Sequence, residues 1–264
     1  MAGNAQVIGN YLKALNQARS SIKPIASLTE TFGSISTEDA YQVQLKMLED
    51  KENQGERLIG WKVGLTNPAV WDSFPFPIKE PVFGWITDRN DYSGCIELSR
   101  SSFCFLRMEA EIDLVLKATL KGPGVTTADV VSATSGAMAA IELVGGRLTE
   151  LKSITDLVAD DSSHVGLMLG PFMKPIIDFD LRWESVMISK NGHHLASACG
   201  CEVLGNPINV VRWLANKLAQ FGRELSAGSI ISTGSLAKII PLEPGDVMNI
   251  SFRNLGNIQF AVTK

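Results

Sequence analysis

The stretch Met108–Leu116, MEAEIDLVL, decides the fold class. Its even-numbered positions are all apolar, whereas Glu109, Glu111 and Asp113 occupy odd-numbered positions. Strict alternation is typical of a β-strand, in which residues two apart face the same side. The pattern therefore predicts that Glu109 and Glu111 point the same way, with Cβ atoms about 7 Å apart. Spacing alone leaves two interpretations open: carboxylates that converge on a hard divalent cation, or the solvated face of an amphipathic strand.

A third glutamate favours the cation. Glu142 lies in the apolar, Gly-rich stretch GAMAAIELVGG at 136–146, where an unpaired ionised carboxylate would be costly to bury. Three glutamate oxygens without a nearby His or Cys ligand suit Mg²⁺ or Mn²⁺ better than zinc. An ion pair between Glu142 and Arg147 is the alternative.

Lys62 belongs to the same group of candidate site residues. It lies in GWKVGLT at 60–66 between apolar neighbours, so we expect a partly buried side chain at the start of a strand. A lysine in that position either pairs with a carboxylate or binds an anionic ligand.

The remaining pattern places this strand in an α+β fold. Helical spacing and a capping signal predict helices over 4–20 and after Ser36, whereas short apolar runs cut by Gly and Pro predict a sheet-rich body from Arg57 onward. We expect a helical N-terminal segment, 1–55, packed on a catalytic body, 56–264, that forms one structural unit. Within that body the sequence predicts helices over Thr127–Ala140 and Pro207–Gln220, and a hairpin at the Asn-Gly turn before His193.

Composition excludes several classes of function. The 264 residues are 45% hydrophobic and carry 24 Lys and Arg against 28 Asp and Glu, a net charge of −4. The chain has no basic block that could neutralise phosphates and no long apolar run, so we expect neither a nucleic-acid partner nor a membrane partner. Because the start of the chain is amphipathic and the four cysteines form no CxxC pair, we expect a cytoplasmic protein with cysteines acting as small strand residues.

Seven motifs together carry a family resemblance, from Arg57 to the C-terminus. In chain order they are GWKVGLT, RMEAEI, ELVGGR, VADDSS, EVLGNPINVVRWLANKL, SAGSIISTGS and PLEPGD. This ordered set resembles the 2-keto-4-pentenoate hydratase and 4-oxalocrotonate decarboxylase branch of the fumarylacetoacetate hydrolase superfamily. The resemblance implies a mixed, rolled β-sheet body with a metal-binding cleft.

The resemblance also implies roles for individual residues. Mg²⁺ or Mn²⁺ would be held by Glu109, Glu111 and Glu142, and a 2-oxo acid would chelate that metal. Catalytic roles fall to Lys62, Ser163 and Asp160, and substrate binding to Arg107, Val82, Thr233 and Ser235. Asp161 stands where the family often has Asn, so it either changes the local charge or faces solvent. For His164, in the adjoining loop, we expect an exposed position or a supporting contact.

The chemistry implied for this branch is that of a lyase. A metal-chelated enolate would lead either to hydration of a 2-hydroxypenta-2,4-dienoate-type substrate or to decarboxylation of a vinylogous 2-oxo dicarboxylate, and we favour hydration. Val82 is the main departure, because hydratases of the branch tend to be acidic in that segment. The alternatives are a non-catalytic metal-binding partner of such a lyase and, less favoured without a motif histidine, a carbon–carbon hydrolase. We also expect a homo-oligomer that could associate with a companion lyase.

Overall fold

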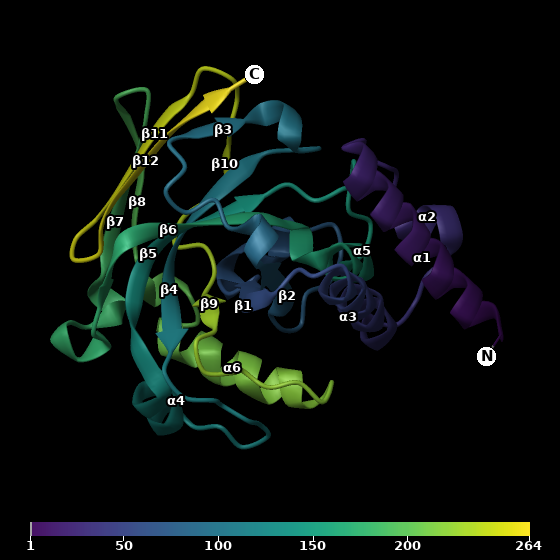
Figure 1. The fold of residues 1–264 in the computed structure, drawn as a ribbon, viewed down its shortest axis with the longest axis horizontal. Coiled ribbons are helices and arrows are strands. Elements are labelled where there is room, and N and C mark those ends of the chain that lie inside the picture. The colour runs from purple at the N-terminus through teal and green to yellow at the C-terminus, as the bar shows by residue number, and fades with distance from the viewer. Residues whose placement is uncertain (1) are drawn as a thin grey trace.

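The computed structural model describes residues 2–264, with side chains from Ala5 onward. The chain begins with three helices, α1 (Ala2–Ser21), α2 (Leu28–Phe32) and α3 (Thr37–Asn53), which lie together at one end of the molecule (Figure 1). The Ser36 hydroxyl accepts a hydrogen bond from the Asp39 amide and so caps α3. The two N-terminal helices predicted from periodicity are confirmed, and α2 is an additional short helix.

The larger sheet contains the strand formed by the MEAEIDLVL stretch. Its strand order is β2-β1-β9-β4-β5-β6, and β10 pairs with β4. The β1–β9 pair is parallel and the other pairs are antiparallel, so the sheet is mixed as expected. Its strands are β1 (Leu58–Gly64), β2 (Val82–Thr87), β4 (Arg107–Leu116), β5 (Thr134–Val144), β6 (His164–Lys174), β9 (Ile230–Ser232) and β10 (Ile240–Pro241).

A second sheet packs beside the first in the order β3-β12-β11-β7-β8. The predicted hairpin joins β7 to β8, and its turn residues Asn191 and Gly192 have φ of 53° and 79°, the left-handed backbone that an Asn-Gly pair favours. The strands are β3 (Glu97–Ser99), β7 (Ser185–Lys190), β8 (His193–Cys199), β11 (Val247–Phe252) and β12 (Gly256–Thr263).

Three helices belong to the body: α4 (Thr127–Ala133), α5 (Ile154–Ala159) and α6 (Pro207–Ala219). The predicted helix over 207–220 is confirmed, but the helix predicted over Thr127–Ala140 is wrong beyond Ala133. From Thr134 the chain becomes β5, which lies between β4 and β6. Pairing on both edges overrides the helical preference of the alanines, whose small side chains suit a crowded inner strand.

Buried polar contacts attach the N-terminal helices to the body. The Gln44 side chain, in α3, donates hydrogen bonds to the carbonyls of Phe83 in β2, at 2.9 Å, and Val158 in α5, at 2.8 Å. Asp156, also in α5, accepts from the hydroxyls of Ser27 and Thr29. These contacts hold the helices against β2, the edge strand that pairs with β1, in which Lys62 lies.

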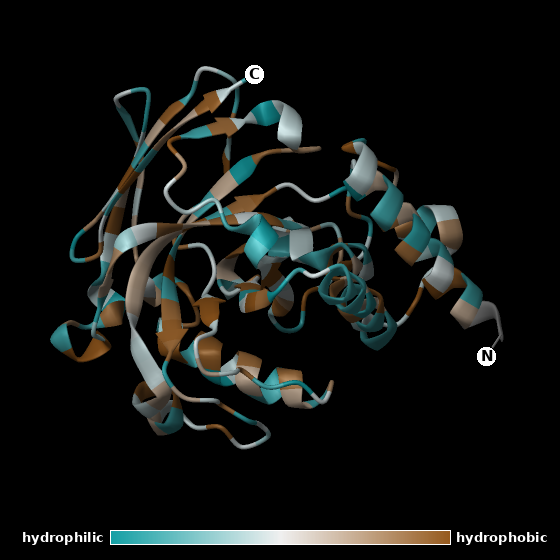
Figure 2. Ribbon diagram, viewed as in Figure 1, coloured by the Kyte–Doolittle hydropathy of each residue, from teal (hydrophilic) through white to brown (hydrophobic). Residues whose placement is uncertain are grey.

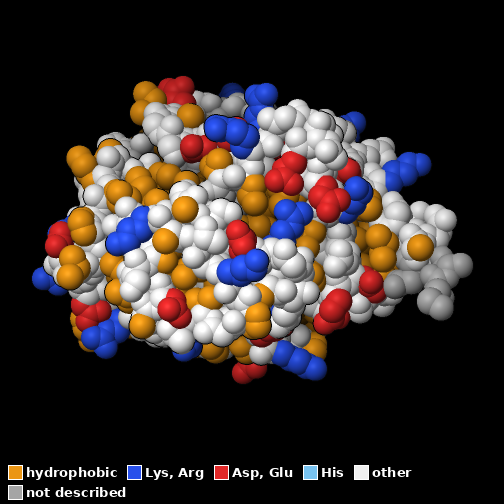
Figure 3. All heavy atoms as spheres, turned by 60° about the horizontal axis from the view of Figure 1, so that its bottom comes forward, with side chains coloured by type: hydrophobic (Ala, Val, Ile, Leu, Met, Phe, Trp, Pro, Cys, Tyr) orange, Lys and Arg blue, Asp and Glu red, His pale blue; other side chains and the backbone are white. Residues whose placement is uncertain are grey.

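The surface is mixed in charge and apolar residues concentrate in the strands and α6. In Figure 2 these elements are largely brown, the colour of hydrophobic residues, whereas α3 is largely teal, the colour of hydrophilic ones. On the face in Figure 3, basic and acidic side chains are interspersed. Among the helices that the structure describes, none combines the length and apolar character needed to cross a bilayer.

Gly60 controls how β1 is positioned. A Cβ atom at this buried residue would collide with the backbone carbonyl of Ile230, in the parallel neighbour β9. We expect Gly60→Ala to destabilise the protein by about 1–3 kcal/mol through overpacking, measured by urea unfolding. Gly9→Ala is the control: this exposed position in α1 has open space around it, so the change should stabilise the protein by up to about 1 kcal/mol. Equal effects at the two positions would contradict the prediction.

Candidate metal centre and active site

Strands β4 and β5 bring the three glutamates together. Glu109 and Glu111 share one face of β4, and the antiparallel register sets Glu109 directly opposite Glu142. One carboxylate oxygen from each glutamate lies within 4.8 Å of the others. Glu111 and Glu142 are fully buried, because β4 and β5 are inner strands of the sheet. The solvated-face interpretation of MEAEIDLVL is therefore wrong, and the carboxylates converge.

Burial and mutual repulsion raise the pKa values of the β4 acids Glu109, Glu111 and Asp113, whereas burial of Glu142 is outweighed by Lys62 and His164, which lower its pKa. Burial, followed by the charge of Glu142, raises the pKa of Glu109 to about 7. The same two causes raise the pKa of Glu111 well above its ordinary value, with Asp113 adding to the repulsion. Burial raises the pKa of Asp113 to about 7 although the Ser232 hydroxyl donates to it at 2.8 Å. A divalent cation would favour the ionised forms of all these groups.

One oxygen of Glu111 tests whether the site suits a cation. Oε2 of Glu111 accepts a hydrogen bond from the Gly234 amide at 2.8 Å. Oε1 is buried, and no hydrogen-bond donor among the described residues contacts it. A buried carboxylate oxygen without a donor is expensive unless a cation approaches it, so the all-oxygen donor set fits a hard divalent ion.

Lys62 extends from β1 into the same cluster. Its Nζ atom lies 3.2 Å from Oε2 of Glu142 and donates to the carbonyl of Ser162 at 3.1 Å. Burial would lower the pKa of Lys62, but the carboxylates of Glu142, Glu109 and Glu111 outweigh it, and the pKa is raised. The ammonium therefore stays charged, and the predicted pairing of Lys62 with a carboxylate is confirmed.

Arg147 pairs with Asp160 and not with Glu142. Its guanidinium contacts Asp160, with Nη1 3.0 Å from Oδ1, and donates to the carbonyl of His164. The alternative pairing of Arg147 with Glu142 is therefore wrong. Both oxygens of Asp160 are engaged by Arg147, so in this structure Asp160 orients the arginine, and a catalytic role for it stays a prediction.

The VADDSS motif forms an unusual turn, η4 (Asp161–Ser163). All three residues have positive φ, of 53°, 48° and 63°, a costly backbone for residues other than glycine. Hydrogen bonds hold this strained turn: the Trp85 amide donates to Asp161 at 2.9 Å, and the Ser162 hydroxyl donates to the Phe83 carbonyl at 2.7 Å. The turn presents the Ser162 carbonyl to Lys62, a contact that sequence reasoning did not identify.

Two further residues of this segment lie inside the protein. Asp161 does not face solvent: it is fully buried, and burial raises its pKa to about 8 although Arg19 opposes the shift. His164 is also buried, with Nδ1 2.9 Å from Oε1 of Glu142, so it makes the supporting contact and is not exposed. Burial lowers the pKa of His164, which favours a neutral ring that donates its Nδ1 hydrogen to Glu142.

Ser163 and two of the predicted substrate-binding residues, Thr233 and Ser235, make hydrogen bonds with the backbone. The Ser163 carbonyl accepts hydrogen bonds from the amides of Gly145 and Gly146. Thr233 and Ser235 donate their hydroxyls to the carbonyls of Ile112 and Ala237. In this structure the TGS turn reaches the cluster through the Gly234 amide rather than through either hydroxyl.

Val82 and Arg107 complete the predicted set. Val82 is buried and pairs with Gly64 across β1 and β2. A Cβ atom at Gly64 would lie 3.2 Å from Lys62 Nζ and 3.5 Å from a Val82 methyl, so Gly64 lies between the ammonium and this apolar side chain. Arg107 begins β4, with Nη2 3.5 Å from the Gly145 carbonyl. The catalytic and substrate-binding assignments of the residues above stay predictions.

Comparison with known proteins identifies the family. Residues 91–263 match the model of the fumarylacetoacetate (FAA) hydrolase C-terminal region. The chain belongs to the FAA hydrolase family. A 2-hydroxyhexa-2,4-dienoate hydratase of Comamonas testosteroni is 36% identical over 97% of this chain and 98% of its own length. A 2-hydroxypent-2,4-dienoate hydratase of Pseudomonas putida is 38% identical over 79% of this chain and 94% of its own.

A solved structure agrees with this placement. The 4-oxalocrotonate decarboxylase from Pseudomonas putida G7, complexed with magnesium and adipate, superposes with a TM-score of 0.92 at 30% identity, over 98% of this chain and 97% of that chain. The predicted fold class and family resemblance are both confirmed. The relatives include hydratases and a decarboxylase, so the family alone leaves the reaction of this chain open between the two.

The raised carboxyl pKa values predict how stability depends on pH in metal-free protein. A group with a raised pKa in the folded state binds protons more tightly there, so its contribution to stability is lost as pH rises through the folded value. Glu109 and Asp113, near 7, and Asp161, near 8, should make EDTA-treated protein progressively less stable, by at least roughly 3 kcal/mol in total, as pH rises from about 4 to about 8, with little further loss above that pH.

Urea unfolding at several pH values checks this expectation. Glu109→Gln should flatten the slope, whereas the control Glu97→Gln, at an exposed position in β3, should leave it unchanged. Saturating Mg²⁺ should restore stability at high pH. Stability that rises with pH over this window in the metal-free protein would contradict the electrostatic account.

Proposed function

We propose that this protein is a divalent-metal-dependent hydratase that converts a 2-hydroxypenta-2,4-dienoate-type acid into a 4-hydroxy-2-oxo acid. The convergence of Glu109, Glu111 and Glu142 beside the Lys62 ammonium carries the proposal. Two hydratases, which match 97% and 79% of this chain, support the proposal further.

Glu109, Glu111 and Glu142 would hold Mg²⁺ or Mn²⁺, the ions that suit an all-carboxylate donor set. When bound, the metal would supply Lewis acidity that stabilises negative charge developing on the 2-oxygen and C1 carboxylate of the substrate. The Gly234 amide and the neutral His164 ring each hydrogen-bond one of these glutamates. Such contacts orient ligand carboxylates and fix which oxygen faces the ion.

Lys62 would attract and orient the anionic substrate. Its charge is retained by the surrounding carboxylates, and the Ser162 carbonyl fixes the direction of Nζ. Val82 would form an apolar wall against the hydrocarbon part of a dienoate.

The direct test is turnover of 2-hydroxypenta-2,4-dienoate. The loss of the substrate's ultraviolet absorbance measures this turnover. Activity should require Mg²⁺ or Mn²⁺, disappear with EDTA and return when metal is restored. Glu109→Gln should lower kcat/KM by at least about 100-fold, whereas Glu97→Gln should leave it unchanged, with circular dichroism verifying that both variants fold. Turnover that EDTA does not affect would contradict the metal mechanism.

Decarboxylation of a 4-oxalocrotonate-type dicarboxylate is the second candidate. Two observations favour it: the apolar Val82 and the superposition on a decarboxylase. An assay that offers the dienoate and the vinylogous dicarboxylate separately, with carbon dioxide and the hydroxylated product both measured, distinguishes the two. We expect kcat/KM for dienoate hydration to exceed that for carbon dioxide release at least about tenfold. The reverse ratio would make the protein a decarboxylase.

The assembly state belongs to the same proposal. We expect the hydratase to act as a homo-oligomer on a small-molecule 2-oxo acid, and an association with a companion lyase remains a prediction of the resemblance.

A further inference from the structure

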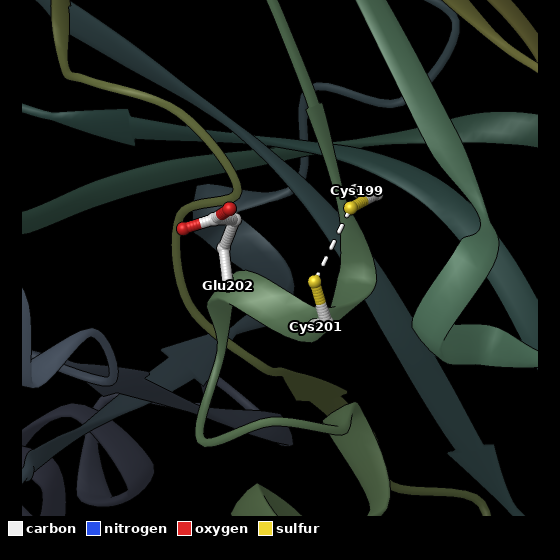
Figure 4. Close-up of side chains that lie close together, drawn as sticks. All are labelled: Cys199, Cys201 and Glu202. Atoms are coloured by element: carbon white, nitrogen blue, oxygen red, sulfur yellow. Dashed lines mark hydrogen bonds between the residues drawn. The ribbon is translucent and has the colours of Figure 1, made fainter.

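Two thiols and a carboxylate meet at the end of β8, apart from the three glutamates. Cys199 is the last residue of β8, and Cys201 and Glu202 lie in the following 3₁₀ turn, η7 (Gly200–Glu202). The two Sγ atoms are 3.3 Å apart, and one oxygen of Glu202 lies within 4.8 Å of both. Figure 4 shows the three side chains on the same side of the turn.

The backbone between the thiols is fixed by packing. The Gly200 amide donates to the carbonyl of Glu184 at 3.0 Å. Gly200 is buried, and a Cβ atom there would collide with the carbonyl of Leu181. The turn therefore holds Cys199 and Cys201 at a set separation, and binding a ligand between them would require little reorganisation.

The carboxylate is oriented as well. Oε2 of Glu202 accepts a hydrogen bond from the Asn67 side-chain amide at 3.1 Å, the kind of outer contact that metal-ligating carboxylates typically make. Both cysteines are half-buried and Glu202 is exposed, so an ion can reach the group from solvent. The fourth position of a tetrahedral site would be open to water.

The chemistry of this donor set differs from that of the glutamate cluster. Two thiolates select a soft or borderline cation such as Zn²⁺, whereas three carboxylates select a hard one. Tetrahedral zinc with Zn–S bonds near 2.3 Å would place the sulfurs roughly 3.8 Å apart. The observed separation is shorter by about 0.5 Å, a change within reach of small rotations of the two side chains.

We propose that Cys199, Cys201 and Glu202 form a second metal site, specific for a thiophilic divalent cation of the zinc type and completed by water. This proposal depends on the geometry of these three side chains and is independent of the proposed hydratase activity.

Cobalt titration tests this site in the full-length protein. After reduction with a phosphine, and with excess Mg²⁺ present to compete at the glutamates, Co²⁺ should produce thiolate-to-cobalt charge-transfer absorption that saturates at one ion per chain and is displaced by Zn²⁺. Cys201→Ser should abolish this absorption. Asn67→Ala should weaken Co²⁺ affinity about tenfold or more by releasing the carboxylate of Glu202.

Matched controls separate this site from others. Cys95→Ser, at an exposed cysteine elsewhere, and Glu109→Gln should both retain the absorption, and thermal unfolding verifies that each variant folds. Absence of thiolate-to-cobalt absorption in the reduced wild type would overturn the proposal. Equal absorption in the wild type, Cys199→Ser and Cys201→Ser would also overturn it. So would the finding that Cys199 and Cys201 form a reversible disulfide and that the reduced protein binds no cobalt through sulfur.

Discussion

The buried contact between Lys62 and Glu142 is the interaction on which the candidate active site depends. Lys62 lies in β1 and Glu142 in β5, with β9 and β4 between them in the sheet, so the ion pair spans four neighbouring strands. Removing Lys62 would leave the buried charge of Glu142 without its cationic partner, typically a loss of several kcal/mol. The helices, the Gly60 close approach and the strained η4 turn all serve to keep Lys62 at this place.

The sheet also explains why so many acids are tolerated in the interior. Glu109, Glu111 and Asp113 follow one another on one face of β4, and Glu142 faces them from β5. Three of the four have a stabilising partner of their own: Gly234 for Glu111, Ser232 for Asp113, and Lys62 with His164 for Glu142. The arrangement leaves net negative charge in the cluster, which a divalent cation would balance. The same buried carboxylates therefore form a candidate cation site and destabilise the metal-free protein.

Two features of the carboxylate cluster could be predicted from the sequence because they depend on local pattern. The alternation in MEAEIDLVL fixed the shared face of Glu109 and Glu111, and the apolar setting of Glu142 indicated a buried carboxylate in need of a cation. Prediction failed where pairing partners decide the outcome. The alanine-rich stretch after Ala133 has a helical composition, and only β4 and β6 on its two sides make it a strand.

Contacts across the sheet were equally beyond local reasoning. Arg147 is close to Glu142 in sequence, yet the β5–β6 connection directs it to Asp160. Nothing in VADDSS indicates three consecutive positive φ values, which exist because β2 supplies the hydrogen bonds that hold them. The position of His164 against Glu142 likewise follows from the register of β5 and β6.

The raised pKa values of Glu109 and Glu111 have a consequence for metal uptake. Because Glu109 and Glu111 hold protons more tightly than ordinary carboxylic acids, a cation must displace those protons to bind. Loading therefore acidifies the surrounding solution, and the metal affinity itself climbs with pH near neutrality. As pH falls, protons would therefore compete with a divalent cation for the carboxylates of Glu109 and Glu111.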